Sequence, residues 1–67
     1  MAVAKVSEII SSSKKSFEDA IANGISRSAK TLKNITGAWI SEQKVVVEKG
    51  KIVEWRVIMR VTFVLEK

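Results

Sequence analysis

The sequence predicts a small α+β fold with the element order β-α-β-β, and three observations support it. A stripe of apolar and small residues at helical spacing occupies the middle of the chain. Two long runs rich in β-branched and aromatic residues follow the stripe, and a shorter mixed run precedes it. With 67 residues, no proline and no segment of linker composition, the chain is expected to form one domain over residues 1–67.

The first strand is expected over about residues 3–10, where apolar and polar positions are mixed. Three consecutive serines, Ser11, Ser12 and Ser13, follow this run. Serine is common in turns, so we interpret the patch as the turn into the helix. A phosphate held by these hydroxyls at the helix N-terminus is the functional alternative.

The helix is predicted to begin after Ser16, whose hydroxyl can cap the first turn, with Glu18 and Asp19 favoured there by the helix dipole. Apolar or small residues then recur with the 3-1-3-1 spacing of one helix face. They are Phe17, Ala20, Ile21, Gly24, Ile25, Ser28, Ala29 and Leu32.

The helix is expected to end at Asn34, with Lys30 and Lys33 in its last turn. A glycine inside a helix costs about 1 kcal/mol relative to alanine. Gly24 therefore predicts that this face lies very close to another backbone.

Two long strands are expected over residues 38–48 and 51–66, joined by a hairpin turn at Lys49 and Gly50. One face of the last strand is entirely apolar and includes Trp55, which is predicted to lie in the core against the helix. A strand of about 15 residues is roughly 50 Å long, whereas a helix of about 17 residues is roughly 25 Å long. One helix cannot cover such a ribbon, so a second copy of the chain is expected to cover the remainder.

The opposite face of the last strand still carries Ile52, Ile58 and Val64. If a two-residue turn pairs Glu48 with Lys51, then Gln43 lies opposite Arg56 and Trp39 lies opposite Arg60. These four residues, Trp39, Gln43, Arg56 and Arg60, would then share one face that the helix does not cover.

Composition limits the function classes. The absence of Cys and His excludes disulfides, Cys/His zinc sites and Cys- or His-based catalysis, and no acid/base pair stands out, so no enzyme is expected. No carboxylate cluster resembles a calcium loop. No long apolar run or signal peptide is evident, which predicts a cytoplasmic protein without a membrane partner. The net charge of +5 comes from scattered residues, so a basic nucleic-acid-binding module stays open only as a less favoured alternative, ahead of an enzyme.

Five segments, in this order and spacing, resemble the dodecin family over nearly the whole chain: KVSEI at 5–9, SFEDAI at 16–21, AKTLKN at 29–34, GKIV at 50–53 and VTFVLE at 61–66. The resemblance implies a three-stranded antiparallel sheet that partly wraps one helix. It also implies a homododecamer in the form of a hollow sphere. Many dodecins bind flavins in stacked pairs between subunits, for storage rather than catalysis.

The chain departs from the family at both flavin-contacting positions, because the family's tryptophan falls on Gly37 and its glutamine on Arg56. Trp39 lies two residues beyond Gly37 and therefore on the same strand face. Trp39 either stacks a flavin (riboflavin or FMN) or fills a subunit interface. In the first case Gln43 can hydrogen-bond the flavin's polar edge, and Arg56 or Arg60 can meet a phosphate.

Besides the nucleic-acid-binding module, one further alternative to flavin storage stays open. The same assembly can bind a cation or another phosphorylated small molecule instead of flavin. Arg56 and Arg60 can also form ion pairs between subunits, with Glu42, Glu54 or Glu66 as partners.

Overall fold

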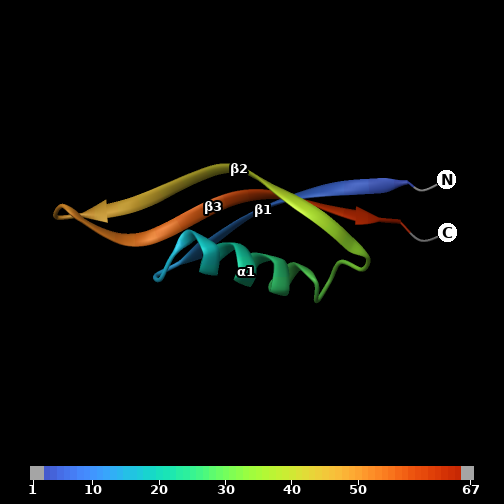
Figure 1. Cartoon of the computed structure of the whole chain (residues 1–67), viewed down its shortest axis with the longest axis horizontal. Helices are drawn as coiled ribbons and strands as arrows, with labels where there is room; N and C mark the ends of the chain where they lie inside the picture. The colour runs from blue at the N-terminus through green and yellow to red at the C-terminus, as the bar shows by residue number, and fades with distance from the viewer. Residues whose placement is uncertain (1–2, 66–67) are drawn as a thin grey trace.

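The computed structural model describes residues 3–65 and contains four elements: β1 (Ala4–Ser13), α1 (Phe17–Ser28), β2 (Ile35–Glu48) and β3 (Lys51–Val64). The strands form one antiparallel sheet in the order β1-β3-β2, so the last strand is the central one. The helix lies across one face of this sheet, against β1 and β3 (Figure 1). The predicted β-α-β-β fold with a three-stranded antiparallel sheet is confirmed.

The molecule is long and thin, with principal extents of 51 × 19 × 13 Å and a radius of gyration of 13.8 Å. A compact chain of this length has a radius of gyration of about 11 Å. The excess comes from the β2–β3 hairpin, which runs well beyond the end of the helix (Figure 1). The expectation that one helix leaves much of the sheet uncovered is therefore confirmed.

The serine patch belongs to β1 and is not the predicted turn, since the chain bends only at residues 14–15. The physical reason is that two of the hydroxyls find partners on the helix above the strand. Ser11 Oγ donates a hydrogen bond to the carbonyl oxygen of Ala20 at 2.7 Å, and Ser13 Oγ donates to Asp19 Oδ2 at 2.6 Å. These small side chains therefore hold the strand and the helix together.

The helix begins as predicted. Ser16 has an extended backbone, and its Oγ accepts a hydrogen bond from the Asp19 amide at 3.0 Å. The predicted end at Asn34 is wrong, because the helix ends at Ser28 and the cation of its last turn is Arg27.

Residues 29–34 instead carry the chain across the sheet. The amides of Lys30 and Thr31 bond to carbonyls three residues earlier, which tightens the chain into turns, and Asn34 has a left-handed backbone with φ of 64°. This crossing is required because β2 pairs on the side of β3 opposite to β1.

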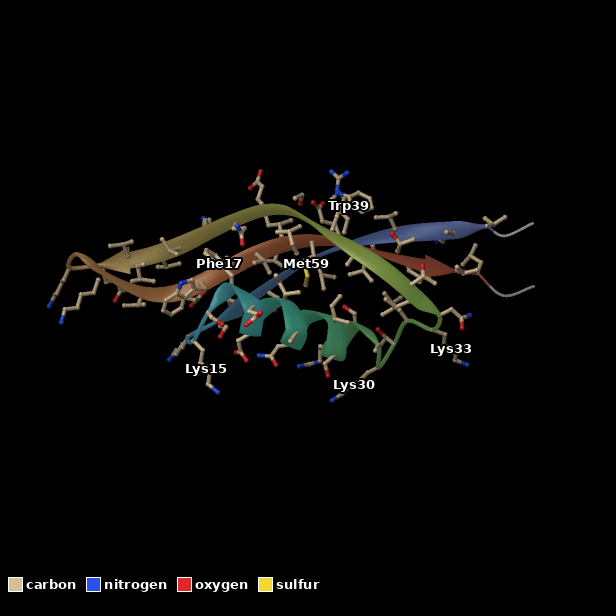
Figure 2. The ribbon with its side chains drawn as sticks, viewed as in Figure 1. Lys15, Phe17, Lys30, Lys33, Trp39 and Met59 are labelled. Atoms are coloured by element: carbon tan, nitrogen blue, oxygen red, sulfur yellow. The ribbon has the colours of Figure 1, made fainter. Side chains whose placement is uncertain are left out.

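The core lies between α1 and β3. Ala20, Val57, Met59 and Val61 are fully buried, and Figure 2 shows the Met59 side chain between the sheet and the helix. A Cβ atom on Gly24 would overlap Met59 Cε and would lie 3.0 Å from Ser11 Cβ. The predicted close approach at Gly24 is present, but its neighbours are side chains of β3 and β1 rather than a backbone.

The Lys49–Gly50 turn is confirmed, with left-handed backbones at both residues (φ of 52° and 77°) and Glu48 paired with Lys51. Three register shifts interrupt the pairing of β2 with β3, at Val46/Val47, at Ile40/Glu42 and at Ile35/Gly37. The second shift compensates for the first, so the pairings from Gly37 to Ile40 match an unbroken ladder that starts at the turn.

The core prediction for Trp55 was only partly right, because its side chain is half-buried and lies outside the cluster around Met59. Its neighbours along the same face explain this. Val53 is exposed to 37%, since the hairpin has already run past the helix, and Leu65 is exposed to 42% at the other end of the chain. The helix covers only the middle of the apolar face.

Candidate functional site

The sheet surface away from α1 carries most of the predicted site. We call it the open face and define it by Arg56, Ile58 and Arg60 of β3, together with the residues paired to them in β1 and β2. Figure 2 shows Trp39 projecting from this side of the sheet. Trp39 lies opposite Arg60, as predicted, and is 47% exposed.

One side chain from each strand meets in a line across the open face. The Arg60 Cζ atom lies 5.7 Å from the centre of the Trp39 ring, within the range of a cation–π contact. Arg60 Nε lies 3.9 Å from Glu8 Oε2 on the other neighbouring strand. The backbone pairing places these three residues side by side, because Arg60 pairs with Glu8 in β1 and with Trp39 in β2.

Gln43 does not join this line, and the predicted pairing of Gln43 with Arg56 is wrong. The shift at Val46/Val47 places Gln43 opposite Val57 and Lys44 opposite Arg56. Val57 is fully buried under the helix, so the register turns Gln43 away from the line of Trp39 and Arg60, although Gln43 still borders the hollow beside that line. Lys44 takes the position on the open face that the unbroken register gave to Gln43.

A hollow of about 170 Å³ lies beside this line of side chains. Ile10 and Ile58, which pair across β1 and β3, form its apolar part. Its remaining lining residues are Arg56, Lys44, Glu42 and Gln43. Ile10, on the edge strand β1, is 67% exposed beside Ile58 of the central strand.

Arg56 is already engaged within the chain. Its Nη2 and Nε atoms donate to one carboxylate oxygen of Glu54, at 2.6 and 3.2 Å. Within one chain, Arg56 therefore pairs with Glu54 of its own strand, and ion pairs between subunits stay a prediction. Glu66, another predicted partner, lies outside the described residues. The hydrogen bond and charge of Arg56 hold the pKa of the Glu54 carboxyl below its ordinary value, with smaller help from Ser12 and Lys14.

This lowered pKa predicts a small loss of stability in acid. The folded state holds the Glu54 proton less tightly than the unfolded state, so the ion pair stabilises the fold above the ordinary pKa of 4.5 and is lost as the pH falls through the lower folded value. We expect Glu54→Gln to reduce the difference in urea midpoint between neutral and acidic pH. Because the pair is near solvent, high salt should weaken the effect. An unchanged pH dependence in Glu54→Gln would contradict this assignment.

Sequence reasoning missed two features: a larger hollow, and Glu8 in the line formed with Arg60 and Trp39. A groove of about 500 Å³ runs between the outer edge of β1 and α1, with Ser11, Asn23, Arg27 and Thr31 among its lining residues. Glu8 was not singled out either. Its role depends on the β1–β3 pairing, for which the local sequence carries no register signal.

Across residues 3–65, no three acidic, histidine or cysteine side chains come together in a way that could hold a metal ion. None of the helical structure in this part of the chain is long and apolar enough to cross a membrane.

The thin β-α-β-β fold and the half-apolar open face define a class of small proteins whose sheet is left uncovered in the single chain. The Dodecin family model matches residues 3–66. The chain belongs to the dodecin family. No curated protein sequence matches it significantly.

Solved structures agree with this assignment. A dodecin from Streptomyces davaonensis is 32% identical, with a TM-score of 0.93 over 98% of this chain and 97% of that chain. A mutant dodecin from Thermus thermophilus is 27% identical, with a TM-score of 0.94 over the full length of both chains. A calcium dodecin from Mycobacterium tuberculosis, described as calcium-chelating, is 34% identical, with a TM-score of 0.82 over 96% of this chain and 91% of that chain.

Proposed function

We propose that the chain forms a homododecameric shell that binds and stores a small planar ligand on the open face, with flavin (riboflavin or FMN) as the leading candidate. The observation that carries this proposal is the half-exposed Trp39 ring beside unfilled space at Gly37. A Cβ atom built on Gly37 meets nothing within 4 Å. Gly37 pairs with Thr62 and Trp39 with Arg60, so both lie on the open face.

Exposed apolar side chains support the assembly. Ile10, Ile52 and Trp39 are 67%, 48% and 47% exposed in the single chain. They are distributed along the open face, from the row of Arg60 to the hairpin turn, so a partner that covers the length of the sheet would bury all three. Covering it with symmetry-related copies removes the exposure and supplies the stability that so small a core lacks.

The charged groups on this face suit an anionic extension of the ligand. Arg56 is held by Glu54, whereas Lys44 lies opposite Arg56 and borders the same hollow. Lys44 and Arg60 are therefore the cations best placed to meet a phosphate. We propose a binding and storage role without catalysis.

A flavin titration tests the proposal. Stacking on an indole quenches flavin fluorescence, so we expect quenching that saturates in the micromolar range or below with the intact protein. Trp39→Ala should abolish the quenching, and Trp55→Phe, which removes the other tryptophan, should retain it. Absence of quenching by the intact protein in the tens of micromolar would overturn flavin binding.

A dodecin-type shell that holds calcium is the second candidate, and the calcium dodecin at 34% identity favours it. No single chain brings three carboxylates together among residues 3–65, so such a site needs Glu42 or other acids from several copies around a symmetry axis. Calorimetric titration with CaCl₂ distinguishes this candidate. Calcium binding by a shell that leaves flavin fluorescence unchanged would support it.

A further inference from the structure

The indole of Trp39 already has a planar cationic partner within its own chain. The Arg60 guanidinium carbon lies 5.7 Å from the ring centre. A guanidinium is flat and weakly hydrated, and it stacks on the same aromatic faces that a flat ligand uses. A planar ligand that stacks on the same face of Trp39 must therefore compete with Arg60 for the ring.

Arg60 also has a second partner on its other side. β3 lies between β1 and β2, so Glu8 and Trp39 flank Arg60 from opposite neighbouring strands. The Arg60–Glu8 distance of 3.9 Å leaves room for a shorter contact. Both side chains are well exposed, at 49% and 58%, so no packing fixes the guanidinium in one place. A guanidinium that leaves the indole can thus move toward the Glu8 carboxylate.

We propose that Arg60 is a built-in competitor for the stacking site on Trp39, and that it selects phosphorylated planar ligands over neutral ones. This inference rests on the proposed function. A neutral ligand such as riboflavin displaces the guanidinium from the ring and has no phosphate that could form an ion pair with it. A ligand with a phosphate gives the displaced guanidinium a new charged partner, so the lost cation–π contact is offset.

Substitutions of Arg60 and Glu8 should change the affinity for riboflavin in opposite directions. An exposed cation–π contact corresponds to about a two- to five-fold change in affinity. Arg60→Ala should therefore strengthen riboflavin binding by about that factor. Glu8→Gln removes the alternative partner of the displaced guanidinium, so it should weaken riboflavin binding. FMN should lose part of its advantage over riboflavin in Arg60→Ala, because the phosphate then keeps only Lys44 as a cationic partner.

The experiment compares dissociation constants for riboflavin and FMN, measured by flavin fluorescence, in the intact protein, Arg60→Ala and Glu8→Gln. Lys30→Ala is the matched control: it removes the same charge from the turn after α1, where Lys30 points away from the sheet (Figure 2). A second readout needs no ligand. In a Trp55→Phe background Trp39 is the only indole, and its quenching by acrylamide should rise in Arg60→Ala.

Three results distinguish the competitor role of Arg60 from the proposed function. Tighter riboflavin binding in Arg60→Ala, weaker binding in Glu8→Gln and no change in Lys30→Ala support the competitor role. Unchanged or weaker riboflavin binding in Arg60→Ala, with flavin bound by the intact protein, overturns the inference and leaves the proposed function standing. Failure of the intact protein and every variant to bind either flavin overturns the proposed function, and the inference with it.

Discussion

Ile10→Asp should convert the shell into small species that approach the 7.4 kDa of one chain. Ile10 is 67% exposed in the single chain and pairs with Ile58 at the centre of the open face. Replacing an exposed side chain disturbs the fold of one chain little. If a partner covers this face, however, the aspartate must be buried without a matching charge, which costs several kcal/mol at each copy of the interface.

Light scattering and native mass spectrometry measure this effect at a fixed micromolar concentration. Ala22→Asp is the matched control, because Ala22 is exposed on the outer side of α1 and the substitution adds the same charge in the middle of an element. We expect Ala22→Asp to keep the mass of the intact protein. A full-size shell in Ile10→Asp would show that the open face is not an interface, and a monomeric intact protein would refute the assembly itself.

Features that depend on local chemistry were predictable from the sequence. The Ser16 cap, the Lys49–Gly50 turn and the pairing of Glu48 with Lys51 each need only a few neighbouring residues. The end of the helix was not predictable in this way. The apolar spacing continues to Leu32, but the chain has to leave the helix at Ser28 in order to reach the far side of β3.

In the candidate site, too, local features were predictable from the sequence and features that depend on long-range pairing were not. Trp39 and Arg60 were correctly paired because the two register shifts between the turn and Trp39 cancel, whereas Gln43 lies between these two shifts and was misplaced. Glu8 could not be found, since its place beside Arg60 depends on a pairing between strands that are distant in sequence. Register shifts and long-range pairings are set by packing, which one sequence does not reveal.

The packing of Met59 against Gly24 predicts a large loss of stability when Met59 is truncated. Met59 is fully buried in the cluster between β3 and α1. Met59→Ala should lower the free energy of unfolding by about 2–5 kcal/mol, because it removes buried atoms and leaves a cavity. Typical domains have only about 5–15 kcal/mol in total, so the loss is severe. Urea unfolding at one fixed protein concentration measures it, since assembly makes stability concentration-dependent.

Gly24→Ala should cost more in the intact protein than in the Met59→Ala variant. In the intact protein the added methyl overlaps Met59 Cε and crowds Ser11 Cβ, an overpacking cost of about 1–3 kcal/mol that opposes the gain of about 1 kcal/mol in helix propensity. In Met59→Ala the overlap with the thioether is gone, so only the close approach to Ser11 still opposes the helix gain. Gly24→Ala should therefore lower the free energy of unfolding of the intact protein by more than it lowers that of the Met59→Ala variant. An equal effect in both backgrounds would mean that Met59 does not cause the requirement for glycine at this position.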